Sequence, residues 1–154
     1  MDPVEATLND LKTLPGRLMG VDFGDTRTGI AISDVSRFLA SGIGYISPGG
    51  IEKTADAVAS LAREKGAVGV IVGLPKNMDG SEGFRAQRCR EFAELLRQRL
   101  ENTPVVMIDE RMTTMSASRY LNETNTRGTK RKQVIDTLSA QIILQNALDR
   151  LKHL

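Results

Sequence analysis

The sequence is poor in the residues that build several common kinds of active site. Among its 154 residues it has one cysteine, one histidine and no tryptophan. One cysteine cannot form an internal disulfide, and one histidine argues against a histidine-based zinc site or a Ser-His-Asp triad. Cys89 is at helical spacing with Phe92 and Leu96, which predicts a buried structural thiol rather than a nucleophile. The single cysteine fits a reducing compartment.

The sequence also lacks long apolar runs and carries little net charge. No run approaches the roughly 20 apolar residues that cross a bilayer, and the chain does not begin with a basic segment followed by an apolar one, so we expect a cytoplasmic protein with no membrane partner. The net charge of +2 does not by itself indicate a nucleic-acid partner. Aromatic residues make up 4% of the chain, which gives only weak support to a platform for stacking bases.

The order of the expected elements indicates one α/β domain, residues 17–154, behind an N-terminal extension, residues 1–16. The extension has apolar residues at helix-like spacing and ends at a Pro-Gly pair. Strands that form hairpins first and then alternate with helices predict a central mixed five-stranded sheet flanked by helices on both faces. The expected strands are a hairpin within residues 18–34 and the segments 42–46, 68–73 and 105–108; the expected helices are 55–62, about 81–100, 115–121 and about 132–151.

Two polar segments adjoin these helices. Ser81 and Glu82 are expected to open the helix that follows them, because the serine can cap its amides and the glutamate complements its dipole. Residues 122–132 are polar and end with four positive charges in six residues. This segment is either a flexible solvated loop or one that grips phosphate.

Asp22 stands inside a strand that otherwise resembles core. Alternation along the strand places it on the side of Leu18 and Gly20, while Met19 and Val21 point the other way. Aspartate is a poor strand residue and is rarely buried without a partner. Either it makes a local turn hydrogen bond or it holds a cation, and the small neighbouring glycines leave room for a ligand.

Further carboxylates occupy positions where core residues are expected. Asp109 and Glu110 end a buried strand, and Asp136 shares a helical line with Ala140 and Ile143. Two bare carboxylates about 4 Å apart repel by about 4 kcal/mol at an effective dielectric of about 20, so converging acids need protons, basic partners or a metal. Each acid singly could instead be structural, through the helix dipole or a nearby arginine. Oxygen ligands without histidine or cysteine suit Mg²⁺ or Mn²⁺, and a pair of such ions would support phosphodiester cleavage.

Four motifs in this order resemble the YqgF/RuvX family over about residues 17–151. They are Gly20-Val21-Asp22-Phe23-Gly24; Gly73-Leu74-Pro75 with Asn77 and Asp79-Gly80; Asp109-Glu110-Arg111-Met112-Thr113-Thr114; and Asp136 with Ala140 and Ile143-Leu144. The resemblance implies an RNase H-like fold related to the RuvC Holliday-junction resolvases. It also implies a metal-dependent nuclease that acts on structured RNA, in 5′-end maturation of pre-16S ribosomal RNA.

The resemblance also assigns roles to residues. It makes Asp22, Glu110 and Asp136 the catalytic acids and the ligands of two Mg²⁺ or Mn²⁺ ions. Asp109 should point to the opposite face from Glu110 if the strand continues that far. The substrate-binding residues that it implies are Asn77, Arg111, Thr113, Thr114, Arg127, Lys130, Arg131 and Lys132.

The expected partner is nucleic acid, with structured RNA preferred and branched DNA also compatible, together with ribosomal precursor particles. The protein is expected to be a monomer or a weak homodimer. Two other functions stay open at this stage: a Holliday-junction resolvase, and a non-catalytic RNA-binding module in ribosome assembly. A likeness of residues 22–29 to the first phosphate loop of actin-like ATPases is set aside, because those proteins need two such domains.

Overall fold

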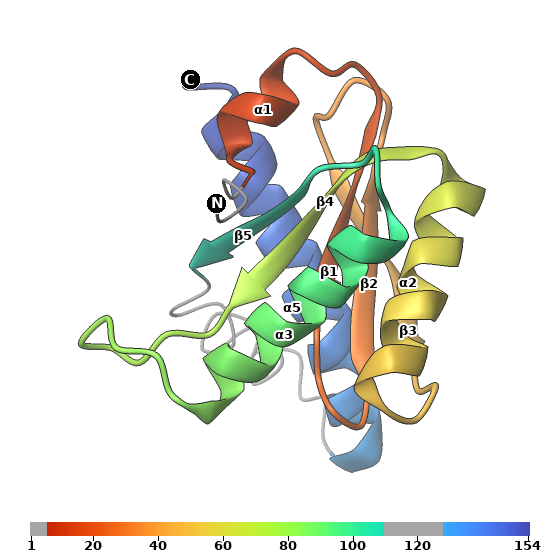
Figure 1. Cartoon of the computed structure of the whole chain (residues 1–154), viewed down its shortest axis with the longest axis vertical. Coiled ribbons are helices and arrows are strands. Elements are labelled where there is room, and N and C mark those ends of the chain that lie inside the picture. The colour runs from red at the N-terminus through yellow and green to blue at the C-terminus, as the bar shows by residue number, and fades with distance from the viewer. Residues whose placement is uncertain (1–5, 110–127) are drawn as a thin grey trace.

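The computed structural model describes the backbone of residues 6–109 and 128–154, and the side chains of residues 6–109 and 137–154. In this part the chain forms a mixed five-stranded sheet, in the order β3-β2-β1-β4-β5, with helices on both faces (Figure 1). The fold class expected from the sequence is confirmed. The elements are α1 (Leu8–Lys12), β1 (Arg17–Asp22), β2 (Thr28–Ser33), β3 (Ala40–Ile46), α2 (Ile51–Lys65), β4 (Ala67–Leu74), α3 (Phe84–Arg99), β5 (Val105–Asp109) and α5 (Gly128–Leu151).

Strand β1 lies at the centre of the sheet and joins its two halves. It pairs antiparallel with β2, where Asp22 lies opposite Gly29, and parallel with β4, where Val21 lies opposite Val72. Strand β4 in turn pairs parallel with β5. The carboxyl ends of β1, β4 and β5 therefore reach the same edge of the sheet, which is where sheets of this kind usually bind ligands.

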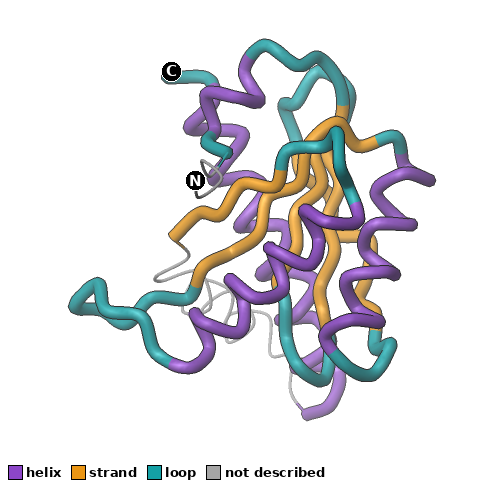
Figure 2. The backbone as a smooth tube through the Cα atoms, viewed as in Figure 1, coloured by secondary structure: helices purple, strands orange, loops and turns teal. Residues whose placement is uncertain are grey.

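Helices α2 and α3 pack on one face of the sheet and α5 packs on the other (Figure 2). Met19 and Val21 of β1 are fully buried on the side of α2 and α3, whereas Leu18 is fully buried on the side of α5. The alternation expected along β1 is thus confirmed. Because side chains alternate between faces along a strand, Asp22 belongs to the α5 side.

Helix α3 begins later than the sequence predicted. It starts at Phe84, so Ser81 and Glu82 precede it and do not cap it. The Ser81 hydroxyl instead donates to the Asp79 carboxylate over 2.6 Å, inside the loop. A guanidinium nitrogen of Arg90 lies 2.8 Å from the Glu82 carboxylate, and this hydrogen bond lowers the pKa of Glu82. Both side chains are engaged by other partners, which explains why the expected cap does not form.

Helix α5 begins earlier than predicted. Its 24 residues start at Gly128, so residues 128–132 form its first turns and not the end of a loop. Lysine, arginine and glutamine at positions 130–133 are good helix formers, which accounts for the longer helix. Throughout the described residues, no helix has the length and apolar character that crossing a membrane requires.

The segment before β1 belongs to the core. As predicted, part of it is helical, and Leu11 of α1 is fully buried in the core beneath α5. Arg37, in the β2–β3 turn, donates to the carbonyls of Leu11 and Gly16 over 2.7 Å each, and also to the carbonyl of Leu14. These three hydrogen bonds attach the segment to the β2–β3 hairpin. Although it precedes the sheet in the sequence, it packs as part of the domain.

Candidate active site

A cavity of about 290 Å³ opens at the carboxyl end of β1. Asp22 is its one predicted site residue, and its side chain is half-buried at the last position of the strand. The position explains how an acid is tolerated in this strand, since solvent reaches the carboxylate from the cavity. The residues that line the cavity are Asp22, Phe23, Gly24, Asp25, Thr26, Arg27, Phe84 and Arg85.

The turn that carries Arg27 is closed by short-range contacts. The Thr28 hydroxyl donates to the carbonyl of Gly24 over 3.3 Å, and the Ser47 hydroxyl donates to the carbonyl of Thr26 over 2.6 Å. A Cβ atom at Gly24 would lie 2.4 Å from the carbonyl oxygen of Arg27, so this position requires glycine. The turn therefore has a defined backbone conformation, and it brings Arg27 into the same cavity as Asp22.

An ion pair attaches the same turn to helix α3. Two guanidinium nitrogens of Arg88 lie 2.7 and 3.2 Å from the Asp25 carboxylate, and a third lies 3.0 Å from Glu91. The hydrogen bond to Asp25 is the main reason why the pKa of Arg88 is raised. Asp25 is thus committed to a structural partner, and Asp22 is the cavity residue that the sequence predicted as a catalytic acid.

Helix α5 approaches β1 closely at Gly20. A Cβ atom there would lie 2.6 Å from the Leu144 Cβ atom and 2.9 Å from the carbonyl oxygen of Ala140. The Lys12 ammonium donates to the Leu154 carbonyl, so the end of α5 lies beside α1, where β1 begins. The helix therefore runs antiparallel to β1.

This geometry brings the backbone of residue 136 level with Asp22. One helical turn of four residues, from 140 back to 136, advances about 6 Å, and the two residues from Gly20 to Asp22 span about 6.7 Å in the same direction. The predicted helical line is also confirmed where side chains are described, because Ala140, Ile143 and Ala147 are all fully buried. The side chain of Asp136 lies outside the described residues.

Replacing Gly20 with alanine is expected to lower the free energy of unfolding by about 2 kcal/mol, because the added methyl group forces α5 away from β1. Urea denaturation measures this. Gly83→Ala is a suitable control, since its Cβ atom would meet nothing closer than 3.7 Å. An equal loss in the two variants would contradict the tight approach at Gly20.

The alternation of side chains along β5 indicates which face of the sheet Asp109 and Glu110 belong to. Val106 and Ile108 are buried on the α5 side, while Val105 packs on the other. Alternation therefore assigns Asp109 to the side away from Asp22, a question that the sequence had left open between Asp109 and Glu110. Glu110 lies outside the described residues, and its place on the α5 side stays a prediction.

Of the remaining predicted residues, one lies in a described loop, three belong to α5 by their backbone, and the others lie outside the described residues. Asn77 lies in the loop after β4, where its amide donates to the Ser81 hydroxyl over 3.0 Å and not into the cavity. Its proposed role at the rim stays a prediction. Outside the described residues lie Arg111, Thr113, Thr114 and Arg127, and the side chains of Lys130, Arg131 and Lys132, whose backbone belongs to α5.

Three cavity residues were missed by the sequence reasoning. Arg27 belongs to the predicted hairpin turn at the end of the strand that holds Asp22, so its place in the same cavity could have been predicted from the hairpin. Phe84 and Arg85 begin α3 and reach the cavity from a different part of the chain. Their place in the cavity with Asp22 depends on how α3 packs against the sheet, which the sequence alone does not predict.

The family profile of RuvX, described as a Holliday junction resolvase, matches residues 16–150. The chain belongs to the RuvX family. A relative from Caldanaerobacter subterraneus subsp. tengcongensis is 45% identical over 139 residues, covering 89% of this chain and 99% of the relative. A relative from Phenylobacterium zucineum is 41% identical over 138 residues, covering 89% and 88%. Both carry the description "Putative pre-16S rRNA nuclease".

Solved structures confirm the RuvC-like, RNase H-like fold of this RuvX-family chain. The structure of T. thermophilus RuvC in complex with a Holliday junction substrate matches with a TM-score of 0.57 at 10% identity, covering 89% of this chain and 96% of RuvC. The fowlpox virus Holliday junction resolvase matches with a TM-score of 0.52 at 14% identity, covering 90% and 99%. At these identities the likeness concerns the fold.

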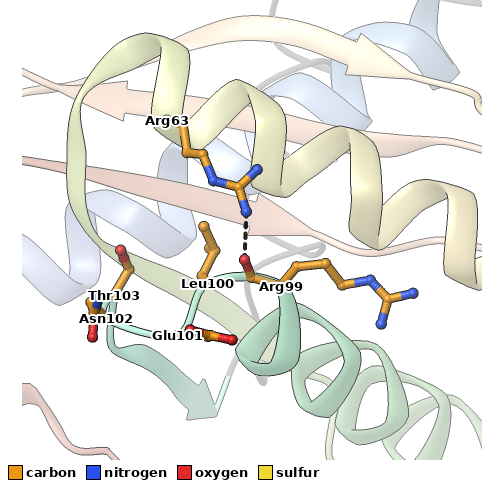
Figure 3. Close-up of a pocket in the computed structure, with 6 residues that line it drawn as sticks. All are labelled: Arg63, Arg99, Leu100, Glu101, Asn102 and Thr103. Atoms are coloured by element: carbon orange, nitrogen blue, oxygen red, sulfur yellow. Dashed lines mark hydrogen bonds between the residues drawn. The ribbon is translucent and has the colours of Figure 1, made fainter.

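A second cavity of this RuvX-family chain, about 440 Å³, lies at the opposite edge of the sheet, where β4 and β5 begin. In Figure 3, Arg63 reaches from α2 to the end of α3, where its guanidinium donates to the carbonyl of Arg99. The Arg99 guanidinium itself lies 2.8 Å from the Asp56 carboxylate. Because both arginines are engaged structurally and no predicted site residue lines this cavity, the smaller cavity at Asp22 is the candidate active site.

Proposed function

We propose that this protein is a metal-dependent nuclease that hydrolyses phosphodiester bonds in pre-16S ribosomal RNA and matures its 5′ end. One observation carries the proposal: a half-buried carboxylate, Asp22, at the cavity where the central strand ends. The descriptions of relatives that are 41–45% identical over most of the chain supply the substrate.

The proposed metal site consists of Asp22, Glu110 and Asp136. These are oxygen donors, which suit Mg²⁺ or Mn²⁺, and the backbone of residue 136 passes level with Asp22. Among the described residues no three potential ligands lie together, as expected when Asp22 is the one predicted ligand with a described side chain. A bound pair of ions would lower the pKa of an attacking water and stabilise the leaving oxygen.

The chain's own basic residues would hold the substrate. Arg27 and Arg85 line the cavity beside Asp22 and can neutralise phosphates on either side of the scissile bond. Residues 130–132 belong to the first turns of α5, and Arg127 precedes this helix in the sequence. We propose that these basic residues also hold phosphate, an attraction to which the positive end of the helix dipole would add. Such contacts grip the backbone without reading the sequence, which suits a structured precursor RNA or precursor particle bound by a monomer or weak homodimer.

The test is cleavage of a labelled 16S precursor RNA that carries its 5′ leader, with Mg²⁺ or Mn²⁺ and after removal of metal with EDTA. We expect cleavage at the leader that stops in EDTA and returns when the ion is restored. A protein that binds this RNA but cuts it with neither ion would be a binding module, and the proposal would be wrong.

A second candidate function is resolution of Holliday junctions. It is favoured by the description of the family profile and by the fold shared with RuvC in complex with a junction. Adding a four-way DNA junction to the same assay separates the two, because a resolvase would cut the junction in preference to the RNA. Resolution of two symmetric strands would also require a dimer.

A further inference from the structure

Tyr45 lies in the same row of the sheet as Asp22, two strands away. Asp22 of β1 pairs with Gly29 of β2, and Gly29 pairs with Tyr45 of β3. Residues directly opposite each other in antiparallel strands share a face, so Tyr45 is on the α5 side with Asp22. Ile46 packs on the other side, which confirms this assignment.

Nothing on β2 separates the two side chains, because the residue between them is a glycine. Adjacent strands lie about 4.8 Å apart, so the backbones of Asp22 and Tyr45 are about 10 Å apart, a distance that one nucleotide can bridge from its phosphate to its base. Tyr45 as a residue is 38% exposed, so solvent reaches it.

Arg27 joins the two positions. Its guanidinium lies 5.9 Å from the centre of the Tyr45 ring, and Arg27 also lines the cavity with Asp22. The hydrogen bond from Ser47 to the carbonyl of Thr26 further ties the turn to the end of β3. Asp22 and Arg27 thus line one cavity, and Arg27 in turn contacts the ring of Tyr45.

We infer that Tyr45 is a positioning residue that stacks on an unpaired base next to the phosphate held at Asp22, while Arg27 contacts the intervening phosphate. The inference rests on the proposed nuclease function and adds that the substrate strand is unpaired at this nucleotide. Stacking on aromatic rings tolerates any base, which matches a site that has phosphate contacts and no base-reading motif. The low aromatic content of the sequence argues against an extended platform, but one well-placed ring suffices for one base.

The test uses an RNA hairpin with a single-stranded flank in which 2-aminopurine replaces each flank base in turn. Binding is measured in Ca²⁺, so that no cleavage is needed, and the fluorescence of the probe falls when its base stacks. We expect Tyr45→Ala to abolish the quenching at one flank position and to weaken binding about 10-fold, within the range of about 5- to 150-fold for the loss of one stacked base. Tyr45→Phe should keep both.

Two controls separate stacking from other roles. Phe38→Ala removes a ring that is 66% exposed and lies under Lys152 at 5.2 Å, in the turn at the other end of the same hairpin, and it should leave binding unchanged. Phe84→Ala removes the exposed ring on the α3 side of the cavity. If Phe84→Ala abolishes the quenching and Tyr45→Ala does not, or if Tyr45→Ala behaves like Phe38→Ala, the inference is wrong.

Failure of the inference and failure of the nuclease proposal give different results. A wild type that cleaves in Mg²⁺ with quenching independent of Tyr45 would retain the function and lose the stacking residue. A wild type that never cleaves but shows quenching dependent on Tyr45 would retain the base contact in an RNA-binding module. A lower melting temperature of Tyr45→Ala with unchanged binding would show a purely structural role and overturn the inference.

Discussion

Asp22→Asn is expected to lower the rate of RNA cleavage by about 10³-fold. This is the size of the rate loss expected when one group that stabilises the transition state is removed. Asparagine has nearly the shape of aspartate but no charge, so it cannot balance a divalent cation. Because the position is the half-buried end of β1, the substitution should leave the fold unchanged. The measurement is single-turnover cleavage of the precursor RNA, with the melting temperature as a check on folding.

RNA binding should survive this substitution or become tighter, because a negative charge near the phosphates is removed. Asp25→Asn provides the matched control: it lines the same cavity, but its partner is Arg88 and its side chain is 57% exposed. An exposed ion pair contributes at most about 1 kcal/mol, so cleavage should fall less than about 5-fold. Equal effects of the two substitutions would mean that Asp22 has no special place in the chemistry.

Leu11→Ala should lower the free energy of unfolding by about 3 kcal/mol, as expected for a leucine truncated in a well-packed core. Leu11 is fully buried, and Gly69 of β4 makes room for it, because a Cβ atom there would lie 2.5 Å from a Leu11 methyl group. Helix α1 has five residues and cannot persist without such packing. Urea denaturation gives the value.

The control for Leu11→Ala is Asn9→Ala, an exposed position in the same short helix, where the expected change is within about 0.5 kcal/mol. If the segment before β1 were only loosely attached, the two variants would be equally stable. Helix α1 lies before residue 16, where the match to the family profile begins. The comparison of the two variants therefore tests whether α1 is part of this chain's stable core.

The fold could be predicted because its strands carry a period of two. The alternation in β1 assigned Met19 and Val21 to one face and Asp22 to the other, and a shift by one residue would have reversed every side chain. Helix starts were harder to predict. Ser81 has the chemistry of a helix cap, but its hydroxyl is bonded to Asp79 two residues earlier, and the sequence does not decide between these two local uses of the serine.

The candidate site could be predicted in part. Asp22 was found because an acid in a strand conflicts with its neighbours, and this conflict is local. Tyr45 was not found, because its relation to Asp22 depends on two strand pairings and on an irregularity between Ile30 and Ala31 that shifts the register of β3. Glu110 and the side chain of Asp136 lie outside the described residues, so their roles stay predictions.

The position of α5 in the chain has a consequence for synthesis. The hairpin and β3 contain mostly local pairings and can form early, but among the described elements α5 covers most of the face that holds Leu18 and Ala31, with Leu11 of α1 beside it. During translation the part of this apolar face that α5 covers stays open to water until residues 137–151 have left the ribosome. In the proposed nuclease, Asp22 would lack Asp136, its proposed partner from α5, until that helix docks. A nascent chain would therefore be inactive on the ribosomal RNA around it until α5 has packed on the sheet.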